Sequence, residues 1–315
     1  MRSAFVRELT SVAAADPRVL LLSGDLGYGA FEAYRTEHPS RFVNAGISEQ
    51  NMVSVAAGLA LGGMRPVVYS IAPFLVLRAA EQIRNDVCFH GLPVVFVGAG
   101  GGFAYGSQGI THHAVDDLAV MRLMPGMAVF APADPVEAAA VVRYALETLH
   151  TPAYIRLARN GEPVIRSAPV DVRAPALYTK GRDVAVVSYG PILSEIRAVA
   201  DYLADAGVSA RVIGLPMLQP FPCELFLSLV PDGMPVVSVE EHRVEGGIGT
   251  IVGEVLLATG RTNRLLSLGV RSQYPTVAGS QSFLLKHEGL DRLTVSARIQ
   301  HWLSSLSRAG GEVGE

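Results

Sequence analysis

Short apolar segments recur along the first half of the chain, each bounded by Gly, Pro or Asp. Their β-branched content, and the helix-length stretches between them, predict alternating strands and helices, as in a parallel sheet. The expected strands are Val19–Ser23, Arg65–Ile71, Pro93–Val97, Met127–Ala131 and Ala153–Leu157.

The second half repeats this alternation after a looser, proline-containing stretch, which we expect to be a linker. The predicted organisation is a first domain at 1–165, a linker at 166–182 and a second domain at 183–315. The fold class is therefore α/β, with two three-layer α/β/α domains. The expected strands of the second domain are Val184–Ser188, Ala210–Leu215, Val236–Val239 and Leu265–Val270.

Composition narrows the classes of function. The 315 residues are 50% hydrophobic and 17% charged, with 26 Lys and Arg against 29 Asp and Glu. The net charge of −3 and the lack of a basic tract argue against nucleic acid as a partner. No apolar run reaches the ~18–20 residues that span a bilayer, and the N-terminus lacks a secretion signal. A soluble, cytoplasmic protein without membrane attachment is expected.

Few side chains are arranged to hold a metal or form a disulfide. Cys88 and Cys223 lie far apart in apolar surroundings without CxxC spacing, so we expect two buried thiols. His112 and His113 follow a Gly-rich loop near two aspartates, but adjacent His side chains point in different directions. We expect no metal site on this chain.

The most informative motif reads GISEQNM at residues 46–52, where a strand delivers the chain to a helix. Glu49 falls in the first turn of that helix, Ser48–Leu61, beside an apolar face. The helix macrodipole favours negative charge in a first turn, and Ser48 suits an N-cap. The residues alone leave capping and a functional role of Glu49 both open.

This motif resembles the start of the pyrimidine-binding helix in transketolases, deoxyxylulose-phosphate synthases and 2-oxo-acid dehydrogenase β subunits. The resemblance implies thiamine diphosphate as the cofactor, with Ile47 and Glu49 among the residues that bind it. It also implies that Glu49 donates a hydrogen bond to the aminopyrimidine ring nitrogen, which helps to generate the nucleophilic ylid. Donation requires a protonated carboxyl, and hence an apolar, water-poor setting.

Three further positions carry the same resemblance. The segment YSIAPFLVLRAAEQIRN at 69–85 is similar to a stretch whose aromatic side chains contact the aminopyrimidine, so Phe74 is expected to stack there, with a core phenylalanine as the alternative. The loop GSQGITHH at 106–113 is similar to one ending in Gly-Pro-Thr-His, which makes His112 a contact to the donor sugar. The role of His113 stays open. Asp25 matches an aspartate near the thiazolium side.

The residues expected to recognise the sugar depart from the family pattern. Gln108 stands where an aspartate commonly binds a donor hydroxyl, and an amide brings no charge. Gly98–Gly102 replace a phosphate-contacting histidine; their N–H groups could face an anion, although a lone Gly-rich loop is weak evidence. Arg159 resembles the arginine that binds the acceptor phosphate, with a plain surface charge as the alternative, and Arg2 is expected as a second anion contact. The expected substrate is a sugar or sugar phosphate, and the altered loop leaves room for a non-standard one.

Two features concern assembly. The segment EEHRVEGGIG at 240–249 resembles a structural segment near the subunit interface, where His242 is not expected to be catalytic. The chain lacks the Gly-Asp-Gly motif, followed ~25–30 residues later by Asn, that the family uses to hold Mg²⁺ on the diphosphate. The resemblance therefore implies a partner, the N-terminal transketolase subunit, which carries these ligands. An α2β2 heterotetramer is the simplest assembly.

The expected reaction is transfer of a two-carbon ketol unit from a ketose to an aldose. Glu49 would sustain cofactor activation and His112 would orient the donor oxygens. One alternative is a 2-oxo-acid dehydrogenase β subunit or a decarboxylating synthase, against which Thr111-His112 favours a transketolase. The other is a non-catalytic scaffold, which the presence of Glu49, Phe74 and His112 argues against.

Overall fold

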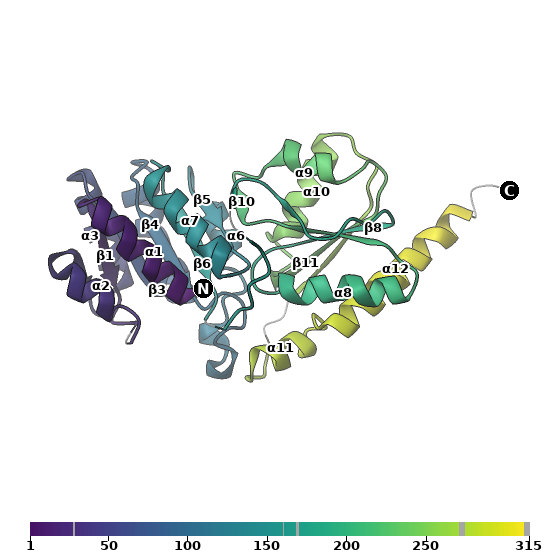
Figure 1. The fold of residues 1–315 in the computed structure, drawn as a ribbon, viewed down its shortest axis with the longest axis horizontal. Coiled ribbons are helices and arrows are strands. Elements are labelled where there is room, and N and C mark those ends of the chain that lie inside the picture. The colour runs from purple at the N-terminus through teal and green to yellow at the C-terminus, as the bar shows by residue number, and fades with distance from the viewer. Residues whose placement is uncertain (28, 160, 168–169, 271–274, 312–315) are drawn as a thin grey trace.

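The computed structural model describes residues 1–27, 29–159, 161–167, 170–270 and 275–311. Its two α/β lobes lie side by side along the long axis of the molecule (Figure 1). Each lobe is a central sheet with helices on both faces, as expected for two three-layer domains. Among the described residues, no helix is both long enough and apolar enough to cross a membrane.

The first sheet has seven strands in the spatial order β10-β5-β6-β4-β3-β1-β2. All neighbouring pairs are parallel except β10 and β5. Because β10 lies beyond the predicted linker, the second half of the chain completes the first sheet. In chain order the strands are β1 (Val19–Ser23), β2 (Phe42–Asn44), β3 (Arg65–Ile71), β4 (Val95–Ala99), β5 (Ala128–Phe130), β6 (Ala153–Leu157) and β10 (Met217–Gln219).

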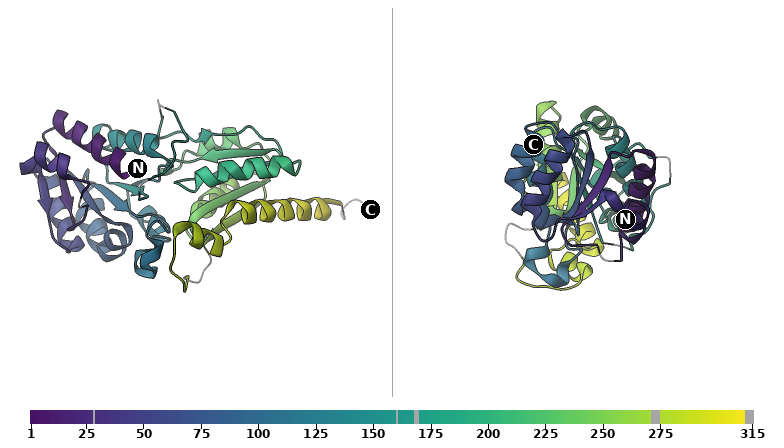
Figure 2. Two further views of the ribbon diagram at one scale, coloured as in Figure 1. Left: turned by 60° about the horizontal axis from the view of Figure 1, so that its bottom comes forward. Right: turned by 90° about the vertical axis from the view of Figure 1, so that its left-hand side faces the viewer.

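Side chains of successive strand residues lie on opposite faces of the sheet and pack against different layers of helices. In β1, Val19 and Leu21 share a core with helices α1 and α7, whereas Leu20 and Leu22 share one with α3 and α4. Figure 2, right, shows this sheet between its two layers of helices. The helical elements of this lobe are α1 (Arg2–Ala15), α2 (Glu32–Glu37), η1 (Pro39–Arg41), α3 (Glu49–Leu61), α4 (Ala72–Arg78), α5 (Ala80–Gln82), η2 (Ile83–Cys88), η3 (Gly106–Gln108), η4 (Ile110–His112), α6 (Asp117–Arg122) and α7 (Pro135–Glu147).

The second sheet has five strands in the order β12-β11-β8-β9-β7, with only β7 antiparallel to its neighbour. Helices α8 and α12 cover one face, and α9 and α10 cover the other. Helix α12 extends to the end of the molecule that is farther from the first lobe (Figure 2, left). The elements are β7 (Ala176–Leu177), β8 (Val184–Ser188), α8 (Leu193–Asp205), β9 (Ala210–Gly214), α9 (Cys223–Leu229), β11 (Val236–Arg243), α10 (Ile248–Ala258), β12 (Leu265–Val270), α11 (Gln281–His287) and α12 (Arg292–Gly311).

Several local expectations need correction. Strand β4 starts at Val95, two residues after Pro93, which has no N–H for a ladder. The three-residue strands β2 and β10 are too short for an alternation pattern, so β10 was not predicted and the strand expected before residue 46 was given no bounds. Cys223 is exposed on α9 and was wrongly expected to be buried, whereas Cys88 is buried, which raises the pKa of its thiol to about 11.

The stretch predicted as a linker is tied to the first lobe where it begins. One oxygen of Asp134 accepts hydrogen bonds from the first N–H groups of α7 and so caps this helix. Its other oxygen accepts from the N–H groups of Ile165 and Arg166, each at 2.8 Å. A single buried carboxylate thus fixes both the helix start and the chain that leaves the domain.

The two lobes meet over buried charged residues at the end of β11. The Glu241 carboxylate accepts from the Phe103 N–H at 2.6 Å and from the Gln281 side chain. Arg156 of β6 donates to the Glu241 carbonyl oxygen at 2.9 Å. Burial of charge without partners is costly, so these contacts hold the lobes in one arrangement.

His242 belongs to the same interface. Its Nδ1 faces the Arg243 carbonyl oxygen at 2.7 Å, and its Nε2 accepts from the Ala119 N–H at 3.4 Å. Burial lowers the pKa of His242 to about 4, and Arg156 acts in the same direction. Burial also raises the pKa of Glu240 to about 7, although hydrogen bonds from the N–H groups that begin α10 act to lower it. His242 is a neutral structural side chain, in keeping with the non-catalytic role expected for it.

This neutral His242 makes stability sensitive to acid. In the unfolded chain the imidazole takes up a proton below about pH 6.5, whereas in the folded chain it does so only near pH 4. The stability it contributes is therefore complete above pH 6.5 and is lost as the pH falls toward 4, up to about 3 kcal/mol. We expect His242→Asn to lower stability at neutral pH but to flatten this acid-side loss.

The measurement is urea unfolding of both proteins at a series of pH values. Glu240, which lies 4.0 Å from His242 and has the opposite pH dependence, is present in both proteins. The matched control is His301→Asn, on the exposed side of α12, which should keep the wild-type profile. An unchanged acid-side slope in His242→Asn would contradict this account.

Candidate active site

Parallel strands deliver the predicted site residues to one edge of the first sheet. Asp25 follows β1, Glu49 begins α3 after β2, and Phe74 lies in α4 directly after β3. The loop that carries His112 follows β4, and Arg159 follows β6. Because carboxyl ends of parallel strands share an edge, residues distant in sequence converge there, as ligand sites of open α/β sheets do.

Glu49 is 1% exposed, and both its carboxylate oxygens are engaged. Ser70 of β3 donates to Oε1 at 3.1 Å, and Arg78 of α4 donates to Oε2 at 2.6 Å. The carboxylate therefore faces β3 and α4 and does not cap α3. Ser48 occupies the N-cap position, but its hydroxyl donates to the Ala45 carbonyl and not to an α3 N–H group. The setting is water-poor as predicted, yet ion-paired and not simply apolar.

A row of side chains leads away from Glu49 along the edge. The Arg78 guanidinium carbon lies 4.8 Å from the Phe74 ring centroid. That ring meets His112 edge-on at 5.0 Å, and His112 meets Tyr105 at 6.5 Å. Arg159 lies over Tyr105 at 5.8 Å. Four predicted residues, Glu49, Phe74, His112 and Arg159, are thus linked through two that the sequence did not single out, Arg78 and Tyr105.

The two adjacent histidines have different environments. The half-buried His112 is hydrogen-bonded through Nδ1 to the Thr111 hydroxyl at 2.9 Å. Burial lowers its pKa, and the neighbouring His113 acts in the same direction, so a neutral imidazole faces the row. His113 is buried against Phe103, and its Nε2 donates to the Gly106 carbonyl at 3.1 Å. His113 therefore holds the loop, and only His112 is presented at the site.

Residues of the second lobe pack against the loop that carries His112. The Gly279 N–H donates to the Gly106 carbonyl at 3.3 Å, next to Leu284 of α11. A side chain at position 106 would overlap both Leu284 and the Gly279 carbonyl. The position of His112 therefore depends on contacts between the lobes.

Packing requires the glycine run Gly98–Gly102, which begins in β4 and continues past its end. A methyl group at Gly98, Gly101 or Gly102 would overlap Tyr154, Arg156 or Glu241, respectively. At Gly100 it would overlap the Tyr105 ring. The N–H groups of residues 100–102 donate to the carbonyls of residues 157 and 114, so they are not aimed at an anion. The phosphate-cradle interpretation has no support here, because the N–H groups that it needs already have partners.

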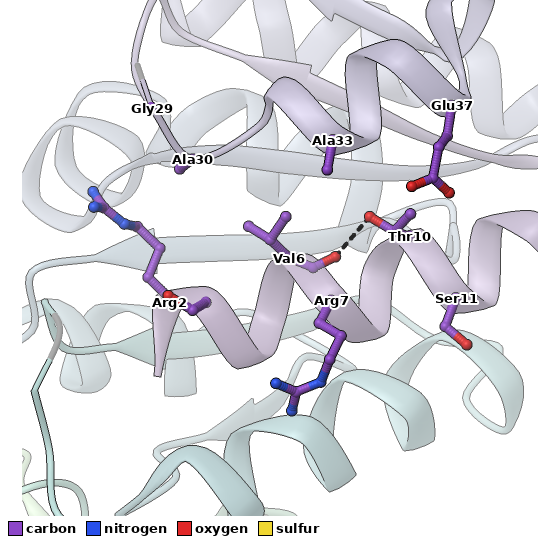
Figure 3. Close-up of a pocket in the computed structure, with 10 residues that line it drawn as sticks. Arg2, Val6, Arg7, Thr10, Ser11, Gly29, Ala30, Ala33 and Glu37 are labelled. Atoms are coloured by element: carbon purple, nitrogen blue, oxygen red, sulfur yellow. Dashed lines mark hydrogen bonds between the residues drawn. The ribbon is translucent and has the colours of Figure 1, made fainter.

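The other predicted residues lie at the margins of the row. Asp25 accepts from the Asn44 side chain at 2.9 Å, at the β1–β2 end of the edge. Ile47 is 78% exposed just before α3, and Gln108 is exposed on η3. Arg2 extends from α1 toward Gly29 in a separate pocket of ≈ 490 Å³ (Figure 3). These four lie outside the row of ring and ion-pair contacts that runs from Glu49 to Arg159.

Arg2 approaches the edge from the opposite face of the sheet. The pKa of the Tyr69 hydroxyl is raised, mainly by burial and also by Tyr105. The positive charge of Arg2 and its hydrogen bond act in the opposite direction and lower this pKa. Tyr69 therefore connects Arg2 to Tyr105 of the row. Of the residues that sequence reasoning missed, Arg78 had an available signal, because it lies one helical turn after Phe74.

Comparison with known proteins gives matches over nearly the whole chain. Residues 1–162 match the family "Transketolase, pyrimidine binding domain", and residues 175–293 match "Transketolase, C-terminal domain". An apulose-4-phosphate transketolase subunit from Actinobacillus succinogenes is 37% identical over 81% of this chain and 82% of its own length. A putative transketolase C-terminal section from Methanocaldococcus jannaschii is 31% identical over 95% of each chain.

Longer relatives and solved structures agree with these matches. The 1-deoxy-D-xylulose-5-phosphate synthase of Thermomicrobium roseum is 33% identical, and this chain spans 49% of its length. A split-gene transketolase solved as an inactive β4 tetramer has a TM-score of 0.85 and 33% identity, covering 96% of this chain and 97% of that one. Transketolase structures from Pichia stipitis, at 21% identity and a TM-score of 0.82, share the fold.

The packing role of the glycine run is tested by a matched pair of substitutions. Gly102 (φ +64°) faces Glu241, whereas Gly91 has nearly the same backbone conformation (φ +60°) and nothing within 4 Å. Alanine is strained at both positions, but only Gly102→Ala also displaces the buried carboxylate. We expect Gly102→Ala to lose about 1–3 kcal/mol more than Gly91→Ala in urea unfolding. Equal losses would show that the contact with Glu241 is not what requires a glycine at position 102.

Proposed function

Because the chain belongs to the transketolase family, we propose that it is the C-terminal subunit of a split enzyme that uses thiamine diphosphate. The proposed reaction transfers a two-carbon ketol unit from a ketose to an aldose. The observation that carries the proposal is the buried Glu49 carboxylate, linked through Arg78 and Phe74 to His112. A scaffold without activity would not need a buried carboxylate linked to half-buried aromatic side chains at the carboxyl edge of the sheet.

The residues at the edge fit an aminopyrimidine ring. Glu49 offers a buried carboxylate for a ring nitrogen, and the half-buried Phe74 offers an aromatic face worth about 0.5–1.5 kcal/mol beyond area burial. When bound, thiamine diphosphate supplies the thiazolium carbon that attacks the ketose and stores the resulting negative charge. Ile47 and Asp25 flank this position, Asp25 on the expected thiazolium side.

Exposed apolar side chains beside Glu49 support an obligate partner. Ile47 before α3, Leu77 on α4 and Phe89 after η2 are all exposed, Phe89 by 81%. Helix α3 packs on both α4 and η2, so the three elements belong to one helical layer of the first lobe. Such apolar surface is typical of an interface. We propose that the N-terminal transketolase subunit covers it in an α2β2 assembly and brings the oxygen ligands for Mg²⁺ and the diphosphate.

Sugar recognition is assigned to the outer part of the row. The neutral His112 can donate a hydrogen bond to, or accept one from, the oxygens of the donor sugar. Gln108 lies on the same loop. Arg159, which lies over Tyr105, supplies a positive charge for a phosphate, and Arg2, which interacts with Tyr69, is the second cation. We propose a ketose phosphate as the donor. Apulose 4-phosphate is the first to test, because a 37% identical relative is named for it.

The donor assay tests the reaction class. The complex of this chain with the N-terminal subunit, thiamine diphosphate and Mg²⁺ is given an aldose acceptor and either apulose 4-phosphate, xylulose 5-phosphate or pyruvate. We expect two-carbon transfer from a ketose phosphate without release of carbon dioxide, measured by chromatography of the sugar products. This chain alone should be inactive. Product from pyruvate only, with carbon dioxide released, would favour the decarboxylating alternative.

Glu49→Gln tests the catalytic assignment. The amide keeps the shape of the side chain but cannot share a proton with a ring nitrogen, so we expect kcat to fall by about 10²–10⁴-fold with the fold intact. The matched control is Glu147→Gln, on the exposed surface of α7, which should keep wild-type kcat. Circular dichroism checks the fold of both variants. Unchanged kcat in Glu49→Gln would favour the scaffold interpretation.

A further inference from the structure

Tyr105 lies between the side chain assigned to the sugar and the one assigned to the phosphate. Its ring centroid is 6.5 Å from that of His112, and the Arg159 guanidinium carbon lies 5.8 Å from the same centroid. Because both contacts are made to one ring, His112 and Arg159 can be no farther apart than these two distances placed end to end. A rigid aromatic ring thus sets the largest span between the two side chains.

The backbone next to Tyr105 fixes the place of its ring. A methyl group at Gly100 would overlap two carbons of that ring, and Gly100 has φ +85°, which residues with side chains rarely adopt. The N–H groups of Gly100 and Gly101 both donate to the Leu157 carbonyl, so this backbone is bonded to strand β6. The ring therefore lies against a stretch of chain that is itself anchored in the sheet.

Arg159 is an exposed side chain at the end of β6, where a supporting ring has a clear effect. A long, flexible arginine gives up conformational freedom when it binds an anion, and this cost weakens binding. Stacking on an aromatic face restricts the guanidinium before the ligand arrives. A stacked guanidinium can still donate hydrogen bonds in its own plane, which suits the oxygens of a phosphate.

A second tyrosine extends this arrangement toward Arg2. Arg2 is hydrogen-bonded to the Tyr69 hydroxyl, which also interacts electrostatically with Tyr105. Tyr105 is therefore in direct contact with Arg159 and is connected to Arg2 through Tyr69. The two cations assigned to the phosphate belong to one group of side chains with Tyr105 at its centre.

We propose that Tyr105 is a positioning residue that makes the site selective for phosphorylated sugars, because its ring holds Arg159 ready for the phosphate within a set distance of His112. This inference rests on the proposed function. Tyr105 acts through Arg159 by means of its ring, and its hydroxyl is not required. A sugar without a phosphate reaches His112 but gains nothing from a restrained guanidinium.

The test compares a ketose phosphate with the same ketose lacking its phosphate, in the complex with the N-terminal subunit and thiamine diphosphate. Apulose 4-phosphate and xylulose 5-phosphate each form one such pair. The measured quantity is the ratio of the two kcat/KM values, which does not depend on the fraction of enzyme that is folded. We expect Tyr105→Leu to lower this ratio by about three- to tenfold, through a higher KM for the phosphorylated sugar. Tyr105→Phe keeps the ring and should keep the wild-type ratio.

Binding of inorganic phosphate to the same complex gives a measurement that does not depend on turnover. Calorimetric titration should show a dissociation constant that is about three- to tenfold higher in Tyr105→Leu than in the wild type. Tyr105→Phe should bind phosphate as the wild type does. An unchanged dissociation constant in Tyr105→Leu would contradict the proposal.

A double variant and a matched control check the route. In an Arg159→Gln background, Tyr105→Leu should lower the ratio little further, because the cation that it positions is already gone. The control is Tyr178→Leu. Arg197 lies 5.5 Å from the Tyr178 ring centroid, so this change removes the same kind of stacked tyrosine outside the row. The control should keep the wild-type ratio.

Three kinetic outcomes overturn the proposal. A wild-type ratio in Tyr105→Leu shows that the ring does not select the phosphate, and an equal loss in Tyr105→Phe assigns that role to the hydroxyl. Full additivity with Arg159→Gln shows that Tyr105 does not act through Arg159. In each case two-carbon transfer persists, so the proposed function stands. If the wild-type complex transfers no two-carbon unit from any ketose, the proposed function fails, and the phosphate titration still tests the pair of Tyr105 and Arg159.

Discussion

The Glu241 carboxylate is the contact on which the arrangement of the two lobes and of the edge depends. It is almost fully buried, yet it accepts hydrogen bonds from the Phe103 N–H of the first lobe and from Gln281 of the second. A carboxylate without partners in this place would be strongly destabilising. The end of β11, the loop after β4 and the start of α11 must therefore meet together.

This constraint reaches the candidate site through the loop after β4. Phe103, held by Glu241, packs against His113, and His113 in turn holds Gly106. These contacts fix the position of His112, whose ring faces Phe74. The second lobe supplies none of the residues in the row from Glu49 to Arg159, but it fixes the loop that carries one of them. Its role is positional, which explains why the buried Glu and His residues of β11 lie where the lobes join.

Local pattern predicted the architecture well where segments were long. Five-residue and longer strands, buried on both faces, give apolar runs that single out β1, β3 and β6, and the comparisons confirm the fold class. Strand β10 was missed because three residues carry no period, whereas the equally short β5 was found because apolar residues flank it. Cys223 was misjudged because an apolar neighbourhood in sequence need not be a core in space. The site residues were reached through a motif, whose chemistry stays a proposal.

The sequence by itself determined the alternation that buries both faces of each sheet, and the placement of Glu49 where a strand meets a helix. These depend on neighbours within a few residues, which local physics controls. Only the tertiary structure decided that Glu49 is ion-paired to Arg78, that the glycines make room for Tyr154, Arg156 and Glu241, and that β10 returns to the first sheet. Those contacts join residues from 29 positions apart, for Glu49 and Arg78, to 139 apart, for Gly102 and Glu241. They exist only once the lobes have packed, because burial, and not sequence, selects the partner of each buried charge.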